Sequence, residues 1–196
     1  MKRLAANAPD APIKFWQTIH GGGLVVYPTD TLYGLGADST NPAAIRRLQL
    51  AKGREGPFSV LVGSLESLQD FALVSPAIAG KLVEMLPGPF TIVLRPAPDL
   101  QLHPALIGPG GKIGFRVSSH PFLQGVFSRD SEPVISTSVN QPGQPPLQVP
   151  DLIESGFGSS IDLLLDAGTL PPSGGSTVVD VTRDPWKVLR QGDGKV

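Results

Sequence analysis

Short β-branched runs fill the second half of this chain, and Gly, Pro, Ser or Asp bounds each of them. Strands of a sheet favour β-branched side chains, whereas the bounding residues favour turns. The pattern therefore predicts many short strands. The predicted strands of this half span 91–94, 113–117, 134–136, 162–165, 177–181 and 188–189.

The first half mixes helix signals with apolar runs. Asn41 and Pro42 form a helix start, with a capping side chain followed by proline at the first helical position, and Gly53 marks its end. Without the regular strand–helix alternation of a doubly wound fold, we expect an α/β (α+β-like) domain with a large, twisted, mixed sheet. Further strands are predicted at 24–27 and 58–62, and further helices at 11–20, 64–73, 75–87, 121–127 and 151–154.

The length and composition predict one ordinary globular domain. With 196 residues and 40% hydrophobic content, the chain can bury its own core. We expect this domain over 11–196, preceded by a flexible arm over 1–10. The absence of cysteine excludes disulfides, thiolate metal sites and cysteine nucleophiles. His20, His103 and His120 lack ligand spacing, so we predict surface or capping roles for them and no protein-held metal.

The N-terminus carries no apolar signal segment, and no run approaches the roughly 20 apolar residues of a membrane span. We therefore expect a cytoplasmic protein that does not contact a membrane. The net charge of −1 does not indicate a nucleic-acid-binding protein, although a local basic cleft is compatible with it.

The segment PTDTLYGLG, residues 28–36, directly follows a predicted buried strand. Its glycines permit close approach of the backbone to a ligand, and its hydroxyl and carboxyl groups could bind one. The alternative is a plain capped turn, because Asp and Thr readily bond their own backbone.

A second candidate is Lys52-Gly53-Arg54 at the end of a predicted helix. Lysine as a point charge and arginine as a fork suit phosphate groups. The same cations would also complement the helix dipole without any ligand. The segment is not a Walker loop, which requires GxxxxGK[ST].

Further polar side chains lie in or beside predicted strands. Arg116 is inside an apolar strand, where an unpaired guanidinium would be costly, so it requires an internal or a ligand carboxylate. STSVN, residues 136–140, lies at a strand exit, where side chains bind ligands or form simple turns. Ser176 follows a glycine pair, and Arg190 has no informative context of its own.

Together these segments resemble the YrdC-like family of threonylcarbamoyl-AMP synthases, in its short single-domain form. The resemblance covers roughly residues 12–193 and consists of PTDTLYGLG, KGR, PFSVLV, PGPFTIVL, IGFRV, TSVN, GGSTVVD and LRQG, in that order. It implies a twisted mixed sheet around a concave, cationic cleft. It also implies that ATP, L-threonine and bicarbonate become threonylcarbamoyl-adenylate and pyrophosphate. A tRNA threonylcarbamoyl-transferase complex would use the adenylate, and tRNA itself is a further possible contact.

The resemblance also implies roles for particular residues on the nucleotide side of the cleft. Lys52 and Arg54 would meet the triphosphate and act as the catalytic cations, with Mg²⁺ carried by the ATP phosphates. Ser138 and Asn140 would close on the nucleotide, and Arg190 would contact it.

On the amino-acid side, the resemblance assigns threonine binding to Thr31, Arg116 and Ser176. Arg116 would then hold the threonine carboxylate bidentately.

The chain departs from the family pattern at two places. TSVN replaces the usual TSAN, and the stretch from Arg54 to Pro57 is about two residues shorter than the common loop. Glu55 also stands where basic residues are frequent, which removes positive charge beside the predicted triphosphate. Two alternatives therefore remain: a YciO-type paralogue with the same cleft, and an RNA-binding or ribosome-maturation module.

Overall fold

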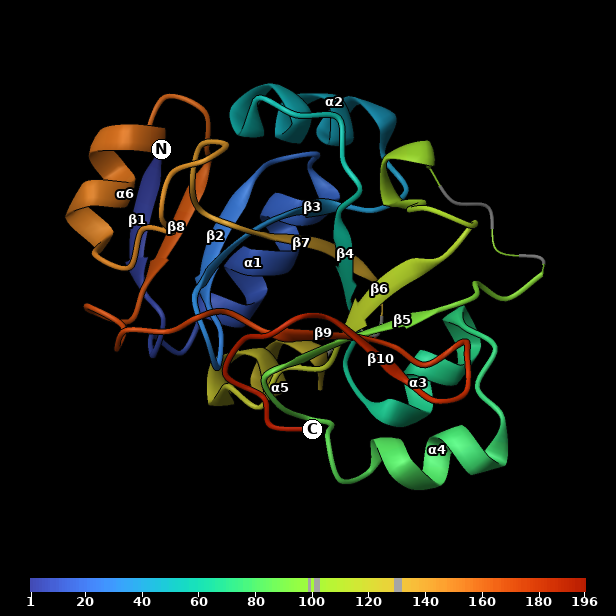
Figure 1. Cartoon of the computed structure of the whole chain (residues 1–196). Helices are drawn as coiled ribbons and strands as arrows, with labels where there is room; N and C mark the ends of the chain where they lie inside the picture. The colour runs from blue at the N-terminus through green and yellow to red at the C-terminus, as the bar shows by residue number, and fades with distance from the viewer. Residues whose placement is uncertain (99, 101–102, 129–131) are drawn as a thin grey trace.

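A computed structural model describes residues 1–98, 100, 103–128 and 132–196 (Figure 1). Ten strands form one mixed sheet in the order β1-β8-β2-β3-β7-β4-β6-β5-β9-β10. The strands are β1 (Lys2–Ala5), β2 (Val25–Pro28), β3 (Tyr33–Asp38), β4 (Ser59–Leu61), β5 (Phe90–Leu94), β6 (Ile113–Arg116), β7 (Val134–Ser138), β8 (Leu163–Asp166), β9 (Thr177–Asp180) and β10 (Lys187–Arg190). The helices are α1 (Ala11–His20), α2 (Pro42–Lys52), α3 (Leu65–Phe71), α4 (Pro76–Leu82), η1 (Pro104–Leu106), α5 (Pro121–Phe127) and α6 (Pro150–Phe157).

The strand order brings segments that are distant in sequence to the middle of the sheet. β3 pairs antiparallel with β7, and β7 pairs antiparallel with β4. β4 runs parallel to β6, and β5 runs parallel to β9. The predicted α/β domain with a large mixed sheet is confirmed.

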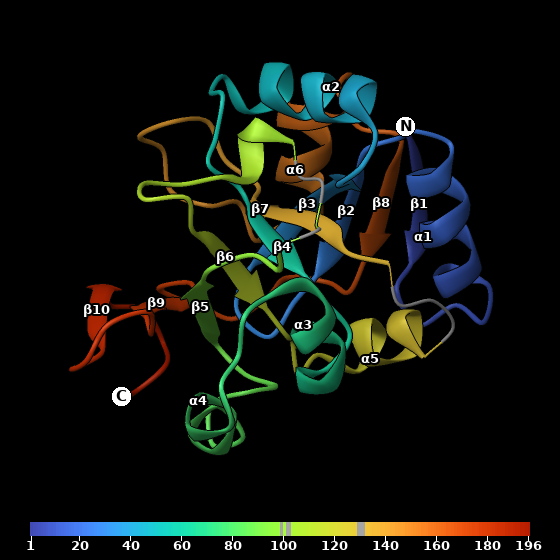
Figure 2. The ribbon, with the colours of Figure 1, turned by 90° about the vertical axis from the view of Figure 1, so that its right-hand side faces the viewer.

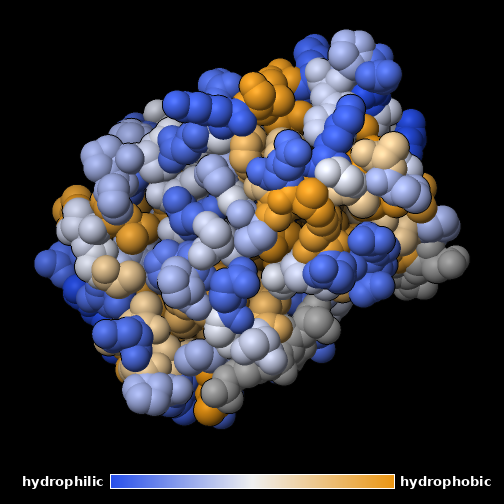
Figure 3. Space-filling model, turned by 90° about the horizontal axis from the view of Figure 1, so that it is seen from below, coloured by the Kyte–Doolittle hydropathy of each residue, from blue (hydrophilic) through white to orange (hydrophobic). Residues whose placement is uncertain are grey.

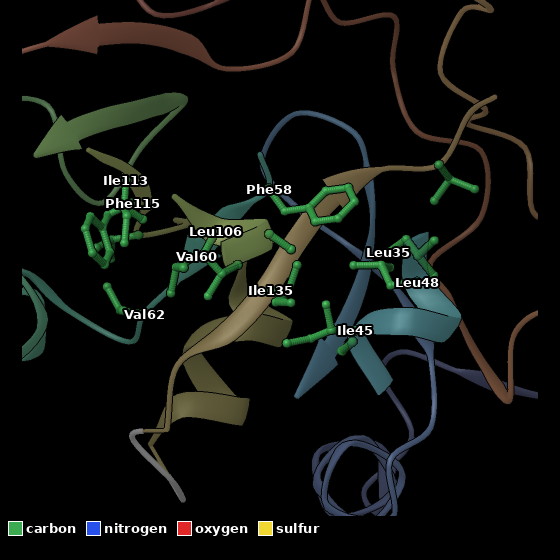
Figure 4. Close-up of a cluster of buried hydrophobic side chains, with 14 of the residues drawn as sticks. Leu35, Ile45, Leu48, Phe58, Val60, Val62, Leu106, Ile113, Phe115 and Ile135 are labelled. Carbon is green, nitrogen blue, oxygen red and sulfur yellow. The ribbon is translucent and has the colours of Figure 1, made fainter. Parts of the chain in front are cut away.

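Both faces of the sheet are covered, because side chains alternate between the faces along each strand. In and just before β2, Leu24 and Val26 belong to one core cluster, whereas Val25 and Tyr27 belong to the other. The first cluster includes the buried sides of α2 and α6, and the second includes those of α1 and α5. Figure 4 shows Ile45 and Leu48 of α2 beside Leu35 and Ile135 of the sheet.

The start and end of α2 confirm the signals predicted for this helix. The Asn41 side chain accepts hydrogen bonds from the backbone of Ala43 and Ala44, at 3.0 and 3.2 Å. Gly53 ends the helix with φ 61°, a left-handed conformation that glycine adopts without a Cβ penalty.

Three predicted elements differ from the structure. The segment 28–36, expected to be a ligand-binding or capped turn, runs into strand β3 (Tyr33–Asp38), whose glycines hide its apolar alternation. Helix α4 ends at Leu82 rather than at Pro87, and α6 spans Pro150–Phe157 rather than 151–154.

The prediction of a flexible arm over 1–10 is wrong for its first half. Lys2–Ala5 forms β1, which pairs in parallel with β8. The Arg3 guanidinium also bonds to the carboxylates of Asp151, Glu154 and Asp166, at 2.7–3.0 Å. The sequence conceals this strand because its side chains are mostly exposed at the edge of the sheet.

β9 and β10 extend from one end of the sheet, away from β1 and β8 at the other end (Figure 2). Figure 3 shows apolar side chains gathered on the lower face of the molecule, among hydrophilic ones. In the described part of the chain, no helix is both long and apolar enough to cross a membrane.

Candidate functional site

A cleft of about 630 Å³ lies on the face of the sheet that α1 and α5 cover only in part. Alternation along the strands explains how the same face becomes core at one place and cleft at another. In β4, Leu61 packs in the α1–α5 cluster, whereas Ser59, two residues earlier on the same face, lines the cleft. In β7, Val134 likewise packs in the α1–α5 cluster, and Ser136 lines the cleft. Small polar residues therefore form the floor of the cleft.

The cleft brings together most of the residues predicted from the sequence. Five of them line it: Arg54, Arg116, Ser138, Ser176 and Arg190. The remaining three, Thr31, Lys52 and Asn140, lie behind the wall and bond to residues that line it or neighbour it.

Lys52 is only 2% exposed, and its ammonium group is held by the turn after β7. Nζ donates to the carbonyl of Ser138 at 2.7 Å, to the side-chain oxygen of Asn140 at 2.8 Å, and to the Asn140 carbonyl. An ammonium has three protons to donate, so these acceptors use all of them. Burial, with a smaller effect from Arg54, lowers the pKa of Lys52 to about 8. Lys52 thus fixes the 138–140 turn from behind.

Asn140 is occupied in the same network. Its side-chain oxygen accepts from the Ser138 hydroxyl at 2.6 Å, and its amide donates to the carbonyls of Gln141 and Gln144. Ser138 is therefore the member of this turn that faces the cleft, with its hydroxyl oriented by Asn140.

Arg54 lines the cleft with neutral partners. Its guanidinium donates to the Pro57 carbonyl at 3.0 Å and to the Thr137 hydroxyl at 3.3 Å, and it lies 4.4 Å from the centre of the Phe58 ring. Burial lowers the pKa of Arg54 from its ordinary value, although arginine remains charged in proteins. Because none of these partners is a carboxylate, Arg54 keeps its net positive charge.

Arg116 has an internal carboxylate partner, which decides the question left open by its sequence context. Its Nη2 donates to Asp30 Oδ1 at 3.0 Å and to the Thr31 hydroxyl at 3.2 Å. The Ser118 hydroxyl donates to the same Asp30 oxygen at 2.7 Å. Burial lowers the pKa of Arg116, and the Asp30 charge opposes that effect. The guanidinium still lines the cleft, so a ligand carboxylate would join an existing pair rather than neutralise a lone cation.

Three buried polar atoms around this pair have no hydrogen-bond partner among the described residues: Asp30 Oδ2, Arg116 Nε and the Tyr27 hydroxyl. Leaving a buried polar group unpaired costs about 1–3 kcal/mol, so each of these atoms calls for a partner such as water or a ligand. Burial raises the pKa of Tyr27 to about 12, which keeps its hydroxyl protonated and able to donate.

The glycines of PTDTLYGLG make room for a neighbouring side chain, in addition to any approach of a ligand to the backbone. A Cβ on Gly34 would lie 2.8 Å from the Tyr27 ring, and one on Gly36 would lie 2.7 Å from it. Tyr27 faces Gly34 across the β2–β3 ladder, so the two glycines make room for its ring. Gly34 also lines the cleft, where its missing side chain leaves the floor open.

Ser176 and Arg190 are joined at the β9–β10 end. The Ser176 hydroxyl shares a 2.7 Å hydrogen bond with Thr91, and Arg190 donates to the Ser176 carbonyl at 2.8 Å and to its hydroxyl at 3.2 Å. Arg190 stands on the exposed strand β10 and reaches into the cleft from the rim.

The sequence-based prediction missed Asp30, Lys112 and Asp180. Lys112 and Asp180 line the cleft and form an ion pair at 2.8 Å. The signal was strand alternation: Lys112 lies four residues before Arg116, on the same face as Gly114. Asp30 belonged to the segment singled out, but nothing in the sequence joined it to Arg116.

The cleft is cationic, as predicted. Among its described lining residues, the charged side chains are four cations and one carboxylate. Glu55 does not lower this charge from within, because its side chain is 80% exposed and lies 3.7 Å from Arg46. The concern raised by Glu55 in the sequence therefore does not apply to the cleft wall.

Comparison with known proteins agrees with this geometry. Residues 17–192 match the Sua5/YciO/YrdC family model, which is described as telomere recombination. The threonylcarbamoyl-AMP synthase of Nitrosococcus oceani is 33% identical over 165 residues, which is 83% of this chain and 88% of that protein.

Two solved structures share the fold. The structure of Pyrococcus abyssi Sua5 complexed with L-threonine gives a TM-score of 0.86 at 26% identity, covering 97% of this chain and 57% of that one. Escherichia coli YciO gives 0.87 at 25% identity, covering 99% of this chain and 95% of its own. This chain thus spans little more than half of the archaeal protein but nearly all of YciO. The match over 17–192 and the shared architecture show that the chain belongs to the Sua5/YciO/YrdC family.

Proposed function

We propose that this chain is a threonylcarbamoyl-AMP synthase, which converts L-threonine, bicarbonate and ATP into threonylcarbamoyl-adenylate and pyrophosphate. The observation that carries the proposal is the convergence of Arg54, Arg116, Ser138, Ser176 and Arg190 on one cleft. Synthases among the relatives and the L-threonine complex of P. abyssi Sua5 support the choice of reaction.

The triphosphate is assigned to the end of the cleft at Arg54 and Ser138. Arg54 keeps its net charge, and the Ser138 hydroxyl is oriented by Asn140. Lys52 holds this turn and adds a buried positive charge behind it. When bound to the phosphates, Mg²⁺ would neutralise part of their charge. The hydroxyl oxygens of Thr137 and Ser138 are hard donors of the kind that Mg²⁺ accepts.

L-Threonine is assigned to the end at Arg116. A threonine zwitterion has no net charge, which suits a site where Arg116 is already paired with Asp30. The threonine carboxylate would bond to the Arg116 guanidinium and the Ser176 hydroxyl, which both line this part of the cleft. Arg190 stands between this end and the nucleotide.

The chemical step then needs positioning and charge rather than a protein nucleophile. The threonine ammonium first loses a proton to solvent. The neutral amine and bicarbonate then give a carbamate with loss of water. A carbamate oxygen forms a bond to the α-phosphorus, the bond to the bridging oxygen breaks, and pyrophosphate leaves. Nucleophile and target are both anionic, so Arg54 and Arg190 would lower the barrier by stabilising charge in the transition state.

The test is pyrophosphate release from ATP in Mg²⁺ buffer, with and without each co-substrate. The proposal expects release only when L-threonine and bicarbonate are both present. Release that ignores either one would contradict it.

A second candidate is a YciO-like protein without this activity, which the match along nearly the whole of E. coli YciO favours. ATP binding without pyrophosphate release would support that candidate.

If the chain is a synthase, the adenylate would pass to a tRNA threonylcarbamoyl-transferase complex, because a mixed anhydride of this kind hydrolyses unless it is consumed.

A further inference from the structure

Lys112 and Asp180 form a fixed pair in the wall of the cleft, apart from every residue used above. Lys112 Nζ donates to Asp180 Oδ2 at 2.8 Å, and the side chains are 22% and 8% exposed. The other Asp180 oxygen accepts from the Thr182 backbone at 3.0 Å and from its hydroxyl at 2.6 Å. Lys112 has three protons and one recorded acceptor among the described residues, so it retains donors for a ligand.

The pair carries no net charge at neutral pH. Burial raises the pKa of Asp180, but the hydrogen bonds from Lys112 and Thr182 outweigh burial and lower it to about 2. An ionised carboxylate beside the ammonium disfavours a phosphate chain, which the uncompensated Arg54 attracts instead. The part of a ligand that fits here is polar but uncharged.

The surroundings of the pair are apolar. Val93 is the register partner of both Asp180 in β9 and Gly114 in β6, and Val178 lies on the same face of β9. The rim segment from Leu106 to Pro109 lies next to Lys112, because the Gly108 amide donates to the Lys112 carbonyl at 2.8 Å. Apolar walls with a small number of precisely placed polar groups are typical of small-molecule sites, and a nucleoside fits such a site.

We propose that Lys112, held in place by Asp180, recognises the nucleoside part of the bound nucleotide by donating a hydrogen bond to an uncharged acceptor of the base or ribose. This inference rests on the proposed nucleotide-binding function and adds a specificity residue to it. Phosphate recognition remains with Arg54.

The experiment compares three ligands by calorimetry: ATP, AMP and inorganic triphosphate. Lys112→Met should weaken ATP and AMP by the same factor, roughly 10-fold or more for a charged donor lost to a neutral acceptor. Its affinity for triphosphate, which has no nucleoside, should stay within about twofold of wild type. Arg54→Met should instead weaken ATP and triphosphate together.

Two further variants guard the interpretation. The double variant Lys112→Met/Asp180→Asn leaves no buried unpaired carboxylate, so it separates a loss of ligand recognition from a loss of folding. It should weaken ATP and AMP and spare triphosphate, as Lys112→Met does. Lys187→Met removes an equal charge from the exposed β10 position opposite Asp180, outside the cleft, and should change none of the three affinities.

Equal losses for triphosphate and ATP in the Lys112 variants would assign Lys112 to the phosphates and overturn the inference. Unchanged ATP and AMP affinities in a folded variant would overturn it as well. The inference also fails if the wild-type protein binds triphosphate and binds neither AMP nor ATP more tightly than triphosphate. If it binds none of them, the proposed function itself fails.

Discussion

The two ends of the cleft hold their arginines with different partners. Arg116 is paired with a carboxylate, Asp30, and surrounded by hydroxyls. Arg54 has a carbonyl, a hydroxyl and an aromatic ring around it, and none of these cancels its charge. One end of the cleft is therefore close to neutral, and the other is positive.

This difference indicates which ligand each end suits. A cation with neutral partners attracts a polyanion, and the attraction is strong where water is partly excluded. A cation that already has a carboxylate offers directional hydrogen bonds without net charge, which fits a zwitterionic amino acid. Both ends carry arginine, so the difference lies in the partners and not in the residue type.

The largest expected effect is the loss of Arg54. Arg54→Met should lower kcat for pyrophosphate release roughly 10³-fold, because a cation on a transferring phosphoryl group contributes about that much or more. The fold should remain intact, since only neutral partners are released. Steady-state kinetics and a melting curve check both statements.

Arg46→Met is the matched control for Arg54, because Arg46 lies on α2, which ends two residues before Arg54, is 64% exposed and does not line the cleft. It should keep wild-type kcat. A kcat for Arg54→Met within about tenfold of wild type would remove this residue from the phosphate site.

Loss of Arg116 should affect both stability and substrate binding. Arg116→Met leaves Asp30 as a buried unpaired charge, which destabilises by about 3–5 kcal/mol in denaturant unfolding. The double variant Arg116→Met/Asp30→Asn should recover most of that stability. It should still bind L-threonine roughly 10- to 100-fold more weakly by calorimetry, because the charged hydrogen bonds are lost.

ATP affinity in that double variant should change little. If threonine affinity returned together with stability, Arg116 would have a structural role only. If ATP affinity fell as far as threonine affinity, the two ends would not be separate sites.

Lys52 gives a smaller effect that depends on pH. Its pKa is about 8 in the folded protein and near 10.5 when unfolded, so between these values the unfolded state binds more protons. Wild-type stability relative to Lys52→Met should therefore rise with pH in this window, by roughly 1–3 kcal/mol, and stay level below pH 8. Urea unfolding of both proteins from about pH 7 to 10 measures it. A flat difference would contradict the burial of Lys52 as a charged group.

Much of the fold and most of the site residues were predictable from local sequence. The α2 helix follows from Asn41, Pro42 and Gly53, whose chemistry acts within a few residues. Strand β3 was missed because Gly34 and Gly36 replaced the side chains that would have shown alternation, and they did so to admit Tyr27 from the neighbouring strand.

The partners within the site were not predictable in the same way. Asp30 and Arg116 are 86 residues apart, and the bonds from Lys52 to the 138–140 turn span a similar distance. The sequence indicated that Arg116 needed an anion but not which one. Lys52 was predicted as a phosphate ligand, a role that no observation tests; the fold shows it bonded to backbone and amide oxygens behind the cleft.

The most direct test of the two-ended cleft is the salt dependence of binding, measured by calorimetry for inorganic triphosphate and L-threonine in the same buffer. Between about 0.05 and 0.5 M KCl, screening should weaken triphosphate binding at the Arg54 end roughly tenfold or more. L-Threonine binding at the Arg116 end should change less than about twofold. The charges of Arg116 and Asp30 cancel each other in the site, and the two charges of the zwitterion cancel each other in the ligand. Parallel weakening of both ligands would contradict the assignment of a positive end and a neutral end.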